Sequence, residues 1–390
     1  MANFQQSLKD LHLTRPTLLL DKNRVIRNIE RMKQKADRAG VQFRPHFKTH
    51  QSAEIGTWFR RCGVTSITVS SLDMAAYFAD HGWKDITVAF TANLLEEKAM
   101  KSLARKIKLN LLLDSVDLAR SLSPLLPAKT RAWIDVDVGY HRTGIPWDEF
   151  SKMIAVARAI LFESKLTFAG LLTHSGHTYH AKSTAEIRRL HNDSLLKLRA
   201  VKKRLKEEGI HPCEISVGDT PSCSVANSFT GADEIRPGNF VFYDLTMSAL
   251  GACRDEDIAV AVACPVVAKY EAWNQVVIYG GAVHLSKEFL LDKKGRRVYG
   301  YAAFPGDASW GPAERRAPVL SLSQEHGLIE INDSFLRQTN VGDLLVILPV
   351  HSCLTADLYR SYLTLDGKKI ERRQSNDLEP NDSLDADKRR

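Results

Sequence analysis

The sequence predicts an α/β protein: a (β/α)8 barrel of the TIM type followed by a second, mostly antiparallel β domain. Up to residue 243, short β-like runs alternate with helical patterns, and eight such runs follow one another. Beyond residue 243, helical periodicity nearly disappears, and β-rich runs are separated by Gly, Pro and charged turns. Repeated β-then-α units favour a parallel sheet, and eight of them favour a closed barrel.

The elements of the barrel follow in order along the chain. We predict strands at 41–50, 65–70, 86–90, 109–113, 133–138, 168–173, 214–217 and 234–236. We predict helices at 22–39, 53–61, 72–80, 94–106, 116–126, 147–162 and 184–208. The first helix is closed by Gly40, which suits the residue after a helix end. These elements define a barrel domain at 20–243.

The second domain is predicted from the remaining β-rich runs. They lie at 259–269, 275–279, 319–323, 328–331 and 344–348, and a further short run at 17–21 precedes the barrel. We expect the N-terminal segment to join this domain, which then comprises 1–19 plus 244–370. Residues 371–390 are polar and charged with almost nothing apolar, so we expect a disordered tail.

Composition limits the classes of partner. The chain of 390 residues is 44% hydrophobic and 26% charged, as in a soluble globular protein. The net charge of +8 comes from basic residues spread beside acids, which is typical of solvated helix faces and not of a nucleic-acid track. No apolar run is long enough to span a membrane, and no secretory signal is visible. Six scattered cysteines without C-x-x-C pairing favour reduced thiols and a cytoplasmic location.

The run 41–50 has an unusual pattern for a strand. Alternation would place Val41, Phe43, Pro45 and Phe47 on one face and Gln42, Arg44, His46, Lys48 and His50 on the other. An amine among imidazoles and a guanidinium is a candidate nucleophile. The alternative is a charged strand edge that faces solvent.

Other polar groups cluster where later strands end, which is where barrel enzymes place their chemistry. Asp135 and Asp137 lead into a loop with His141 and Arg142. The strand at 168–173 leads into His174, His177, Tyr179 and His180. The turns Gly218-Asp219-Thr220 and Gly238-Asn239 offer backbone N–H groups of the kind that cradle phosphate. Together with Lys48, these groups suit a phosphorylated aldehyde cofactor held as a Schiff base.

His351 and Cys353 form a candidate metal pair. Their i, i+2 spacing on an extended segment places both side chains on one side. Imidazole and thiolate together favour zinc. Two protein ligands would leave positions for water or substrate, as in a catalytic site. The alternative is that Cys353 is only a small buried residue.

These motifs resemble a known family. The stretches Arg-Pro-His-Phe-Lys-Thr-His at 44–50 and Asp-Val-Gly-Tyr-His-Arg-Thr-Gly at 137–144 resemble fold-type III pyridoxal-phosphate enzymes, as do the Ser-Gly-His-Thr-Tyr, Gly-Asp-Thr-Pro, Arg-Pro-Gly and Gln-Glu-His-Gly stretches. Within that fold the chain is similar to the D-serine dehydratase and D-threonine aldolase group. The Pro-x-His-x-Cys at 349–353 is similar to the zinc motif of the dehydratase branch, whereas aldolases more often show an acid in place of the cysteine.

The resemblance implies roles for individual residues. Lys48 would bind pyridoxal 5'-phosphate and act as the base, Arg142 would face the ring's phenolic oxygen, Tyr179 the pyridine nitrogen, and His174 would lie near the ring. The residues implied around the phosphate are Gly218, Asp219, Thr220, Gly238 and Asn239. His351 and Cys353 would hold Zn²⁺ or another divalent metal and take part in catalysis. Asp219 stands where the family commonly has serine, so we expect either its backbone N–H to face the phosphate or its carboxylate to turn away.

The implied activity is that of a pyridoxal-phosphate- and zinc-dependent lyase of D-3-hydroxy amino acids. It would convert D-serine, D-threonine or D-3-hydroxyaspartate to a keto acid and ammonia. The resemblance also implies a homodimer. The alternatives are a D-threonine-type aldolase, an amino-acid racemase, a non-catalytic pyridoxal-phosphate-binding protein, and a zinc hydrolase that uses His174, His177 and His180.

Overall fold

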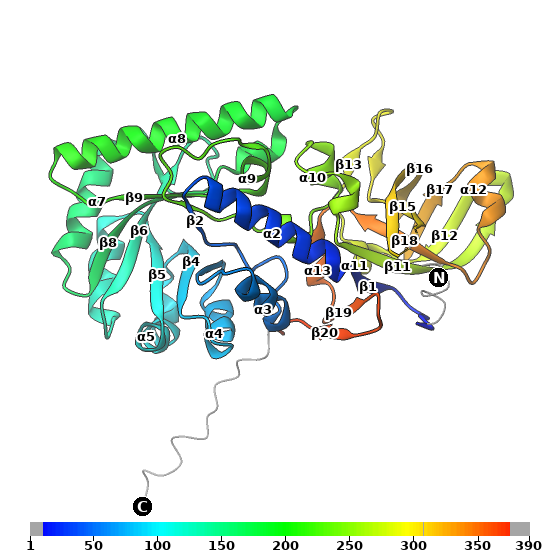
Figure 1. Cartoon of the computed structure of the whole chain (residues 1–390), viewed down its shortest axis with the longest axis horizontal. Helices are drawn as coiled ribbons and strands as arrows, with labels where there is room; N and C mark the ends of the chain where they lie inside the picture. Colours follow the sequence, from blue (N-terminus) through cyan, green and yellow to red (C-terminus); the bar gives the residue numbers. More distant parts are fainter. Residues whose placement is uncertain (1–10, 307, 375–390) are drawn as a thin grey trace, which may run out of the picture.

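The computed structural model describes residues 11–306 and 308–374, which form a β/α barrel and a β domain side by side (Figure 1). Eight parallel strands form the barrel sheet in the order β2-β10-β9-β8-β6-β5-β4-β3. A parallel bridge between His46, just beyond β2, and Thr68 of β3 joins the two ends of this order. The prediction of an α/β barrel with an additional antiparallel β domain is confirmed.

The barrel elements alternate as the sequence pattern indicates. Its strands are β2 (Gln42–Phe43), β3 (Ile67–Val69), β4 (Asp85–Thr91), β5 (Lys108–Leu113), β6 (Thr130–Asp137), β8 (Leu166–Thr173), β9 (Glu214–Val217) and β10 (Glu234–Ile235), with β7 (Ile145–Pro146) paired to β6. Its helices are α2 (Lys22–Arg38), α3 (Ala53–Arg61), α4 (Leu72–Asp80), α5 (Glu97–Lys106), α6 (Val116–Leu122), α7 (Phe150–Phe162), α8 (Thr184–Glu207) and α9 (Thr220–Val225). Four 3-10 helices also lie here: η1 (Leu94–Glu96), η2 (Ser123–Leu125), η3 (Gly176–His180) and η4 (Asn239–Val241).

Helix α2 shows how local sequence sets these boundaries. The side chain of Asp21 accepts a hydrogen bond from the backbone N–H of Arg24 and so caps the helix start. The helix ends before Gly40, which has a φ of +66° that glycine adopts without steric cost. In Figure 1 α2 runs across the boundary between the two domains.

The β domain is built from both ends of the chain. Its strands are β1 (Thr17–Leu20), β11 (Val260–Tyr270), β12 (Gln275–Tyr279), β13 (Leu290–Leu291), β14 (Arg297–Val298), β15 (Gly300–Pro305), β16 (Trp310–Leu322), β17 (His326–Glu330), β18 (Leu344–Pro349), β19 (Ser361–Thr364) and β20 (Lys369–Glu371). Its helices are α10 (Leu245–Ala249), α11 (Ala282–Leu285), α12 (Asp333–Gln338) and α13 (Ser352–Asp357), with 3-10 helices η5 (Asp255–Asp257) and η6 (Glu271–Trp273). Strand β1 pairs between β11 and β19, so the segment before the barrel belongs to this sheet.

The long strand β11 closes the β domain into a ring. Its first half pairs with β1 and β18, and after a register shift near Val266 its second half pairs with β12. Since β12, β17, β16, β15 and β18 follow in hydrogen-bonded order, the sheet returns to β11. The register shift bends the strand, as a bulge does.

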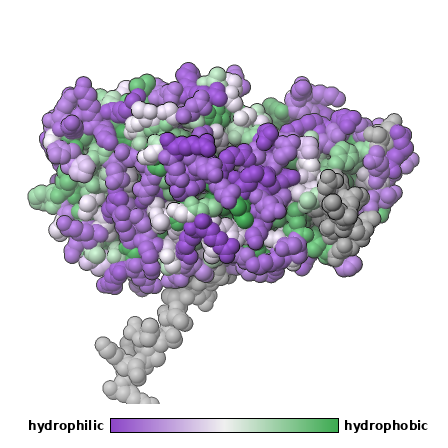
Figure 2. Space-filling model, in the orientation of Figure 1, coloured by the Kyte–Doolittle hydropathy of each residue, from purple (hydrophilic) through white to green (hydrophobic). Residues whose placement is uncertain are grey.

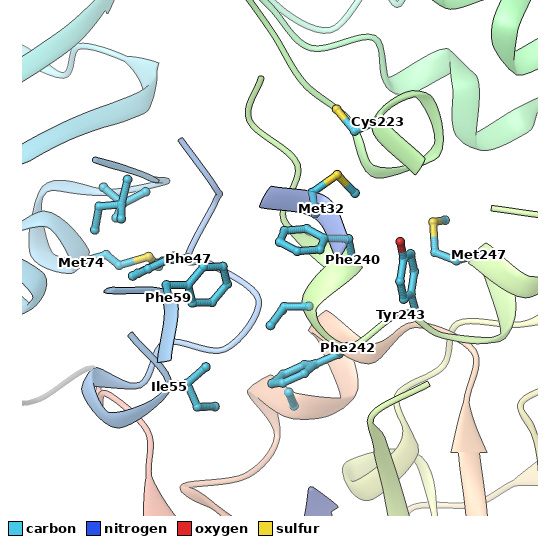
Figure 3. Packing of buried hydrophobic residues seen from close by; sticks show 14 of the residues in the cluster. Met32, Phe47, Ile55, Phe59, Met74, Cys223, Phe240, Phe242, Tyr243 and Met247 are labelled. Atoms are coloured by element: carbon cyan, nitrogen blue, oxygen red, sulfur yellow. The ribbon is translucent and has the colours of Figure 1, made fainter. Parts of the chain in front are cut away.

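Buried aromatic residues join the barrel to the β domain (Figure 3). Phe240 packs on Phe43 and Phe59 of the barrel, with ring centroids 5.7 and 6.2 Å apart, whereas Phe242 packs 5.5 Å from Tyr362 of β19. The outer face drawn in Figure 2 is mostly hydrophilic over both domains. Within the described ranges, no helix combines the length and apolar character that crossing a membrane requires.

Two expectations about the ends of elements are wrong. The strand predicted at 41–50 is regular only to Phe43. Pro45 supplies no backbone N–H, so beyond Phe43 only isolated ladder bonds of Arg44 and His46 remain before the chain turns at 47–50. The tail predicted from residue 371 begins inside β20, and the backbone N–H groups of Arg372 and Arg373 donate to the carbonyl oxygens of Arg360 and Gln51. The rest of the predicted tail, 375–390, lies outside the described residues.

Candidate active site

Lys48 lies in a turn directly beyond the short strand β2. The turn is tied to its neighbours because the N–H of His46 donates to the carbonyl oxygen of Pro237, and the N–H of Phe47 to that of Thr68. Phe47 is fully buried, whereas the side chain of Lys48 is exposed and donates no hydrogen bond within the described residues. The turn therefore presents a free amine at the end of the barrel strands.

The predicted shared face of Gln42, Arg44, His46, Lys48 and His50 is only partly right. The backbone N–H groups of Arg44 and His46 still donate to the β10 side of the barrel, at the carbonyl oxygens of Ile235 and Pro237, but the chain turns at 47–50, so Lys48 and His50 do not continue the alternation. Arg44 is buried in ion pairs with Glu234 and Asp85. His50 is buried against Phe47 and Phe59, with ring centroids 4.4 and 5.5 Å away. Burial lowers the pKa of His46 well below its ordinary value, and the charges of Lys48 and Arg236 add to this. His46 is therefore a neutral neighbour of the lysine.

The β domain holds the lysine turn in three places. The hydroxyl of Thr49 lies 3.3 Å from the sulfur of Cys353. The hydroxyl of Tyr362 donates to the carbonyl oxygen of His50 at 2.7 Å. The amide of Gln51, a residue with a positive φ of 44°, donates to Asp357 at 3.0 Å. Lys48 thus sits at the junction of the two domains.

Arg142 is positioned by a loop folded around Asp137. One carboxylate oxygen of Asp137 accepts hydrogen bonds from the backbone N–H groups of Gly139, Tyr140 and His141. Although burial opposes it, these bonds lower the pKa of Asp137. The guanidinium of Arg142 lies 5.4 Å from the centroid of the Tyr140 ring, and its positive charge acts on His46 and His174. The charges of Arg142 and Lys48 both act on His46 and on His174, so the loop brings Arg142 near the same two imidazoles as Lys48.

His174 and Tyr179 lie together at the end of β8. Nδ1 of His174 donates to the carbonyl oxygen of Gly218 at 2.8 Å, which defines the tautomer if the ring is neutral. Burial, with the charge of Arg142, lowers the pKa of His174 to about 3, so the ring is neutral at ordinary pH. The hydroxyl of Tyr179 accepts a hydrogen bond from the N–H of Thr220 at 3.4 Å, and burial raises the pKa of this phenol.

Glycines allow the two candidate phosphate turns to pack tightly on neighbouring segments: Gly218 on Arg236, and Gly238 on the lysine turn. A Cβ on Gly218 would lie 2.8 Å from the Cβ of Arg236, and one on Gly238 would lie 3.0 Å from the Cβ of His46. The backbone N–H groups of Gly238 and Asn239 donate to no acceptor in the described part of the chain. Such N–H groups beside a free lysine fit a phosphate-bearing aldehyde.

The carboxylate of Asp219 is held by hydrogen bonds to α9 and to η3. One of its oxygens caps α9 by accepting from the N–H of Ser222 at 2.6 Å and from the hydroxyl of Thr178 at 2.9 Å. Burial raises the pKa of Asp219 to about 6. The carboxylate is thus engaged by Ser222 and Thr178, and the expectation about its position relative to a phosphate stays a prediction.

His351 and Cys353 lie beside the lysine turn. Burial opposes a charged imidazole, but the hydrogen bond and charge of Cys353, with Asp244, raise the pKa of His351. Burial likewise opposes the thiolate, yet the hydrogen bond and charge of His351 lower the pKa of Cys353. An imidazole beside a readily formed thiolate is a donor set that fits zinc. No third His, Cys, Asp or Glu completes a metal-binding group in the described ranges, which leaves further positions to water or substrate.

The same finding bears on the three histidines that follow β8, of which His177 and His180 lie in η3. His174, His177 and His180 do not form a metal-binding group within the part of the chain that the structure describes. His174 is held by the Gly218 carbonyl, and the ring centroid of His177 lies 6.4 Å from that of Tyr140. The geometry gives no support to a zinc hydrolase built on these residues.

Asp244 is a buried residue at the site that sequence reasoning missed. Its carboxylate is fully buried and lies 3.8 Å from Nδ1 of His351. The sequence offered one weak indication, since Asp244 follows the candidate phosphate turn by five positions and precedes a short helix. Its partner lies more than a hundred residues away, which no local pattern reveals.

The β/α barrel, the joined β domain and the lysine at their junction define the chain as a fold-type III pyridoxal-phosphate enzyme. The chain belongs to the family described as alanine racemase, N-terminal domain, which matches residues 20–245. A serine dehydratase domain family matches residues 259–365. Within the fold, this combination is that of the D-serine dehydratase and D-threonine aldolase group.

Relatives support this assignment over most of the chain. The D-threo-3-hydroxyaspartate dehydratase of Delftia sp. is 29% identical over 91% of this chain and 95% of its own length. Its solved structure covers 93% of this chain and 98% of that one, with a TM-score of 0.85. The D-serine dehydratase of Dictyostelium discoideum is 27% identical over 90% of this chain and 93% of its own. A solved structure of a D-threo-3-hydroxyaspartate dehydratase variant, in which a cysteine is replaced by alanine, is described as metal-free. It is 26% identical, with a TM-score of 0.86, and the match covers 96% of this chain and 100% of that one.

Proposed function

We propose that this chain is a pyridoxal-phosphate- and zinc-dependent lyase that dehydrates D-3-hydroxy amino acids to a keto acid and ammonia. The candidate substrates are D-serine, D-threonine and D-3-hydroxyaspartate. The observation that carries this proposal is the contact between Thr49 and Cys353, which brings the candidate metal pair to the lysine turn. The names of the Delftia and Dictyostelium relatives agree with such substrates.

The residues at the barrel end where Lys48 lies fit pyridoxal phosphate. Lys48 would hold the aldehyde covalently, and the N–H groups of Gly238 and Asn239, with Gly218, Asp219 and Thr220, would surround the phosphate. Arg142 would face the phenolic oxygen, Tyr179 the pyridine nitrogen, and neutral His174 would lie near the ring. The bound cofactor supplies an electron sink for the charge that develops at the substrate's α-carbon.

The chain's own groups would divide the proton chemistry. Lys48, once displaced by the substrate amine, would remove the α-hydrogen. His351 and Cys353 would hold a divalent metal, preferably Zn²⁺, which supplies a Lewis acid for the substrate's β-hydroxyl group. The neutral phenol of Tyr179 would bring no negative charge to stabilise a protonated ring nitrogen, so the ring would be a weaker electron sink and the metal's contribution would matter more. Loss of the α-hydrogen and of hydroxide gives an enamine, which hydrolyses to the keto acid and ammonia.

A product assay on purified protein tests the proposal. D-serine, D-threonine and the D-3-hydroxyaspartates would be supplied with pyridoxal phosphate and zinc, and ammonia, aldehyde and glyoxylate would be measured. We expect ammonia and keto acid, their loss on chelation, and recovery with added zinc. Aldehyde or glyoxylate without ammonia would show an aldolase instead. Activity that survives chelation, with inversion of the amino acid, would show a racemase, and cofactor binding without turnover would show a carrier.

We also propose a cytoplasmic homodimer. All six cysteines are free thiols in the structure, as expected in a reducing compartment. The dimer rests on the family resemblance, in which the partner's β domain would complete each mouth. Light scattering coupled to size exclusion checks it: twice the chain mass of 43.7 kDa supports the proposal, and a single chain mass contradicts it.

A further inference from the structure

The buried carboxylate of Asp244 contacts both halves of the candidate site. On one side, its Oδ2 accepts a hydrogen bond from the side-chain amide of Asn239 at 2.6 Å. On the other, the same oxygen accepts from the backbone N–H of Ser352 at 2.9 Å and from the Ser352 hydroxyl at 3.3 Å. Ser352 stands between His351 and Cys353, and Nδ1 of His351 is 3.8 Å from Oδ2. One oxygen atom therefore lies between the phosphate turn and the metal pair.

Asn239 completes the connection. Its amide nitrogen also donates to the Ser352 hydroxyl at 3.0 Å and approaches the sulfur of Cys353 at 3.7 Å. Its backbone N–H is one of the two that are free to meet the cofactor phosphate. A shift of Cys353 toward a metal therefore acts directly on the residue that would bind the phosphate.

The segment from Asn239 to Asp244 is too firmly packed to absorb such shifts. Phe240 is anchored in the barrel and Phe242 in the β domain, on either side of the domain boundary (Figure 3). The N–H of Tyr243 donates to the carbonyl oxygen of Asn239 at 2.8 Å, which closes the segment on itself. A rigid segment transmits a constraint from one end to the other, whereas a loose one would dissipate it.

We propose that Asp244 is a positioning residue that couples metal binding at His351 and Cys353 to cofactor binding at Gly238 and Asn239, so that each ligand tightens the other. The inference rests on the proposed function for the identity of the two ligands. A metal would fix Cys353 and His351, which would order Ser352 and the Asn239 amide, so the phosphate would meet a turn that is already arranged. By thermodynamic reciprocity, the cofactor raises metal affinity by the same factor.

A purely structural role for Asp244 predicts a different outcome. Its other oxygen, Oδ1, caps α10 by accepting from the N–H of Met247 at 3.0 Å. If this cap were its whole purpose, replacing Asp244 would lower stability and leave the relation between the two ligands unchanged. The coupling factor, and not stability, therefore distinguishes the two roles.

Asp244→Asn is the informative variant. An asparagine side chain has one acceptor oxygen, so it cannot serve both Met247 and the Asn239–Ser352 side, and its NH₂ group would meet donors. Asp257→Asn is the matched control, since Asp257, like Asp244, carries a buried carboxylate, but it pairs with Arg31 and lies outside this network. Ser352→Ala keeps both Asp244 and the helix cap while removing the hydroxyl that Asn239 contacts.

The experiment measures affinity and not turnover. Full-length apoprotein is titrated with pyridoxal phosphate, in the presence and in the absence of zinc, and binding is followed by absorbance. In a second titration, zinc affinity is measured by competition with a chromophoric chelator, in the presence and in the absence of pyridoxal phosphate. We expect zinc to raise the affinity for pyridoxal phosphate by at least about fivefold in the unmodified chain and in Asp257→Asn. Pyridoxal phosphate should raise the affinity for zinc by the same factor, here called the coupling factor. We expect Asp244→Asn to weaken zinc about 10- to 100-fold and to abolish the factor. Ser352→Ala should reduce the factor.

Several results would overturn the inference. They are a coupling factor of one in the unmodified chain, the absence of zinc binding to the unmodified chain, or an unchanged coupling factor in a folded Asp244→Asn variant. If Asp244→Asn does not fold by circular dichroism, an unchanged factor in Ser352→Ala overturns it instead. The inference stands apart from the lyase assignment: coupled binding without ammonia release from any substrate removes the proposed reaction and leaves the coupling.

Discussion

The hydroxyl of Thr49 lies 3.3 Å from the sulfur of Cys353, although 304 positions separate the two residues in the chain. This contact joins the residue after the candidate cofactor lysine to a candidate metal ligand. It makes the lysine turn and the metal pair one site, so changes on either side should affect the same reaction.

Replacing Lys48 by alanine should abolish cofactor attachment. Lys48 presents the free amine of the site, and loss of a positioned base lowers rates by about 10²- to 10⁴-fold. Borohydride reduction followed by peptide mass analysis should label Lys48 in the unmodified chain and no site in the variant. Lys203→Ala, which removes an exposed lysine of α8, should keep label and activity. A label on another lysine in the unmodified chain would contradict the assignment.

Replacing Cys353 by alanine should remove bound zinc. With one of two protein donors gone, we expect zinc affinity to fall by more than about 100-fold, beyond the typical cost of losing an outer-shell partner. Metal content after dialysis measures this, with ammonia release as a second reading. The control is Cys62→Ala, which alters a free thiol at the end of α3. Full zinc content in the Cys353 variant would place the metal elsewhere.

Adding a methyl group at Gly218 should weaken cofactor binding while the fold persists. The new Cβ would lie 2.8 Å from the Cβ of Arg236 and 2.9 Å from its backbone, so one of the two phosphate turns must move. Overpacking of this kind costs about 1–3 kcal/mol, which corresponds to about 5- to 150-fold in cofactor affinity. Gly311→Ala, whose Cβ would meet the carbonyl oxygen of Phe304 at 3.3 Å in the β domain, should leave that affinity unchanged. Equal affinities in both variants would refute a role for this turn.

The stability of the apoprotein should fall as pH drops below 6.5, in part because of His50. Burial, with the charge of Arg372, lowers the pKa of His50 to about 3, and its Nε2 has no hydrogen-bond partner within the described residues. The unfolded chain therefore binds this proton first, and stability present above pH 6.5 is progressively lost toward pH 3. At pH 5 the loss is about 2 kcal/mol.

Urea unfolding at pH 7.5 and pH 5 tests this. His50→Asn keeps an acceptor for the N–H of Ser52, which Nδ1 of His50 serves at 3.1 Å, but cannot titrate. Its stability should change less between the two pH values than that of the unmodified chain. The exposed His326, changed to Gln, is the control. An identical pH response in His50→Asn would exclude the proposed cause.

The regular parts of the fold follow from periodicity. Helices α3 and α4 and strands β9 and β12 have the predicted bounds, because each is a clear pattern closed by turn residues. Strands β13, β14, β15, β19 and β20 were not predicted, and β16 begins nine residues before its predicted start. In β16, Gly311, Pro312 and a run of charges interrupt the alternation, and pairing with β15 and β17 overrides local preference.

The site was partly predictable for a similar reason. Motifs located Lys48, Arg142 and the glycine turns at strand ends, since barrel topology brings strand ends together. The direction of a side chain within a turn depends on tertiary contacts. The Asp219 carboxylate caps a helix, and His50 points into an aromatic cluster. Asp244 was missed because its partners come from distant segments.

The lysine turn belongs to the barrel by sequence and to the β domain by its contacts. Cys353, Tyr362 and Asp357 hold three consecutive residues, and Arg373 donates its backbone N–H to Gln51 close to the end of the described chain. A fragment ending at residue 243 would keep every barrel strand and lose all four anchors. The barrel alone is thus not the smallest unit able to present this amine. We expect that a truncated protein must retain the strands of the β domain up to β20 to hold Lys48 in place for the cofactor.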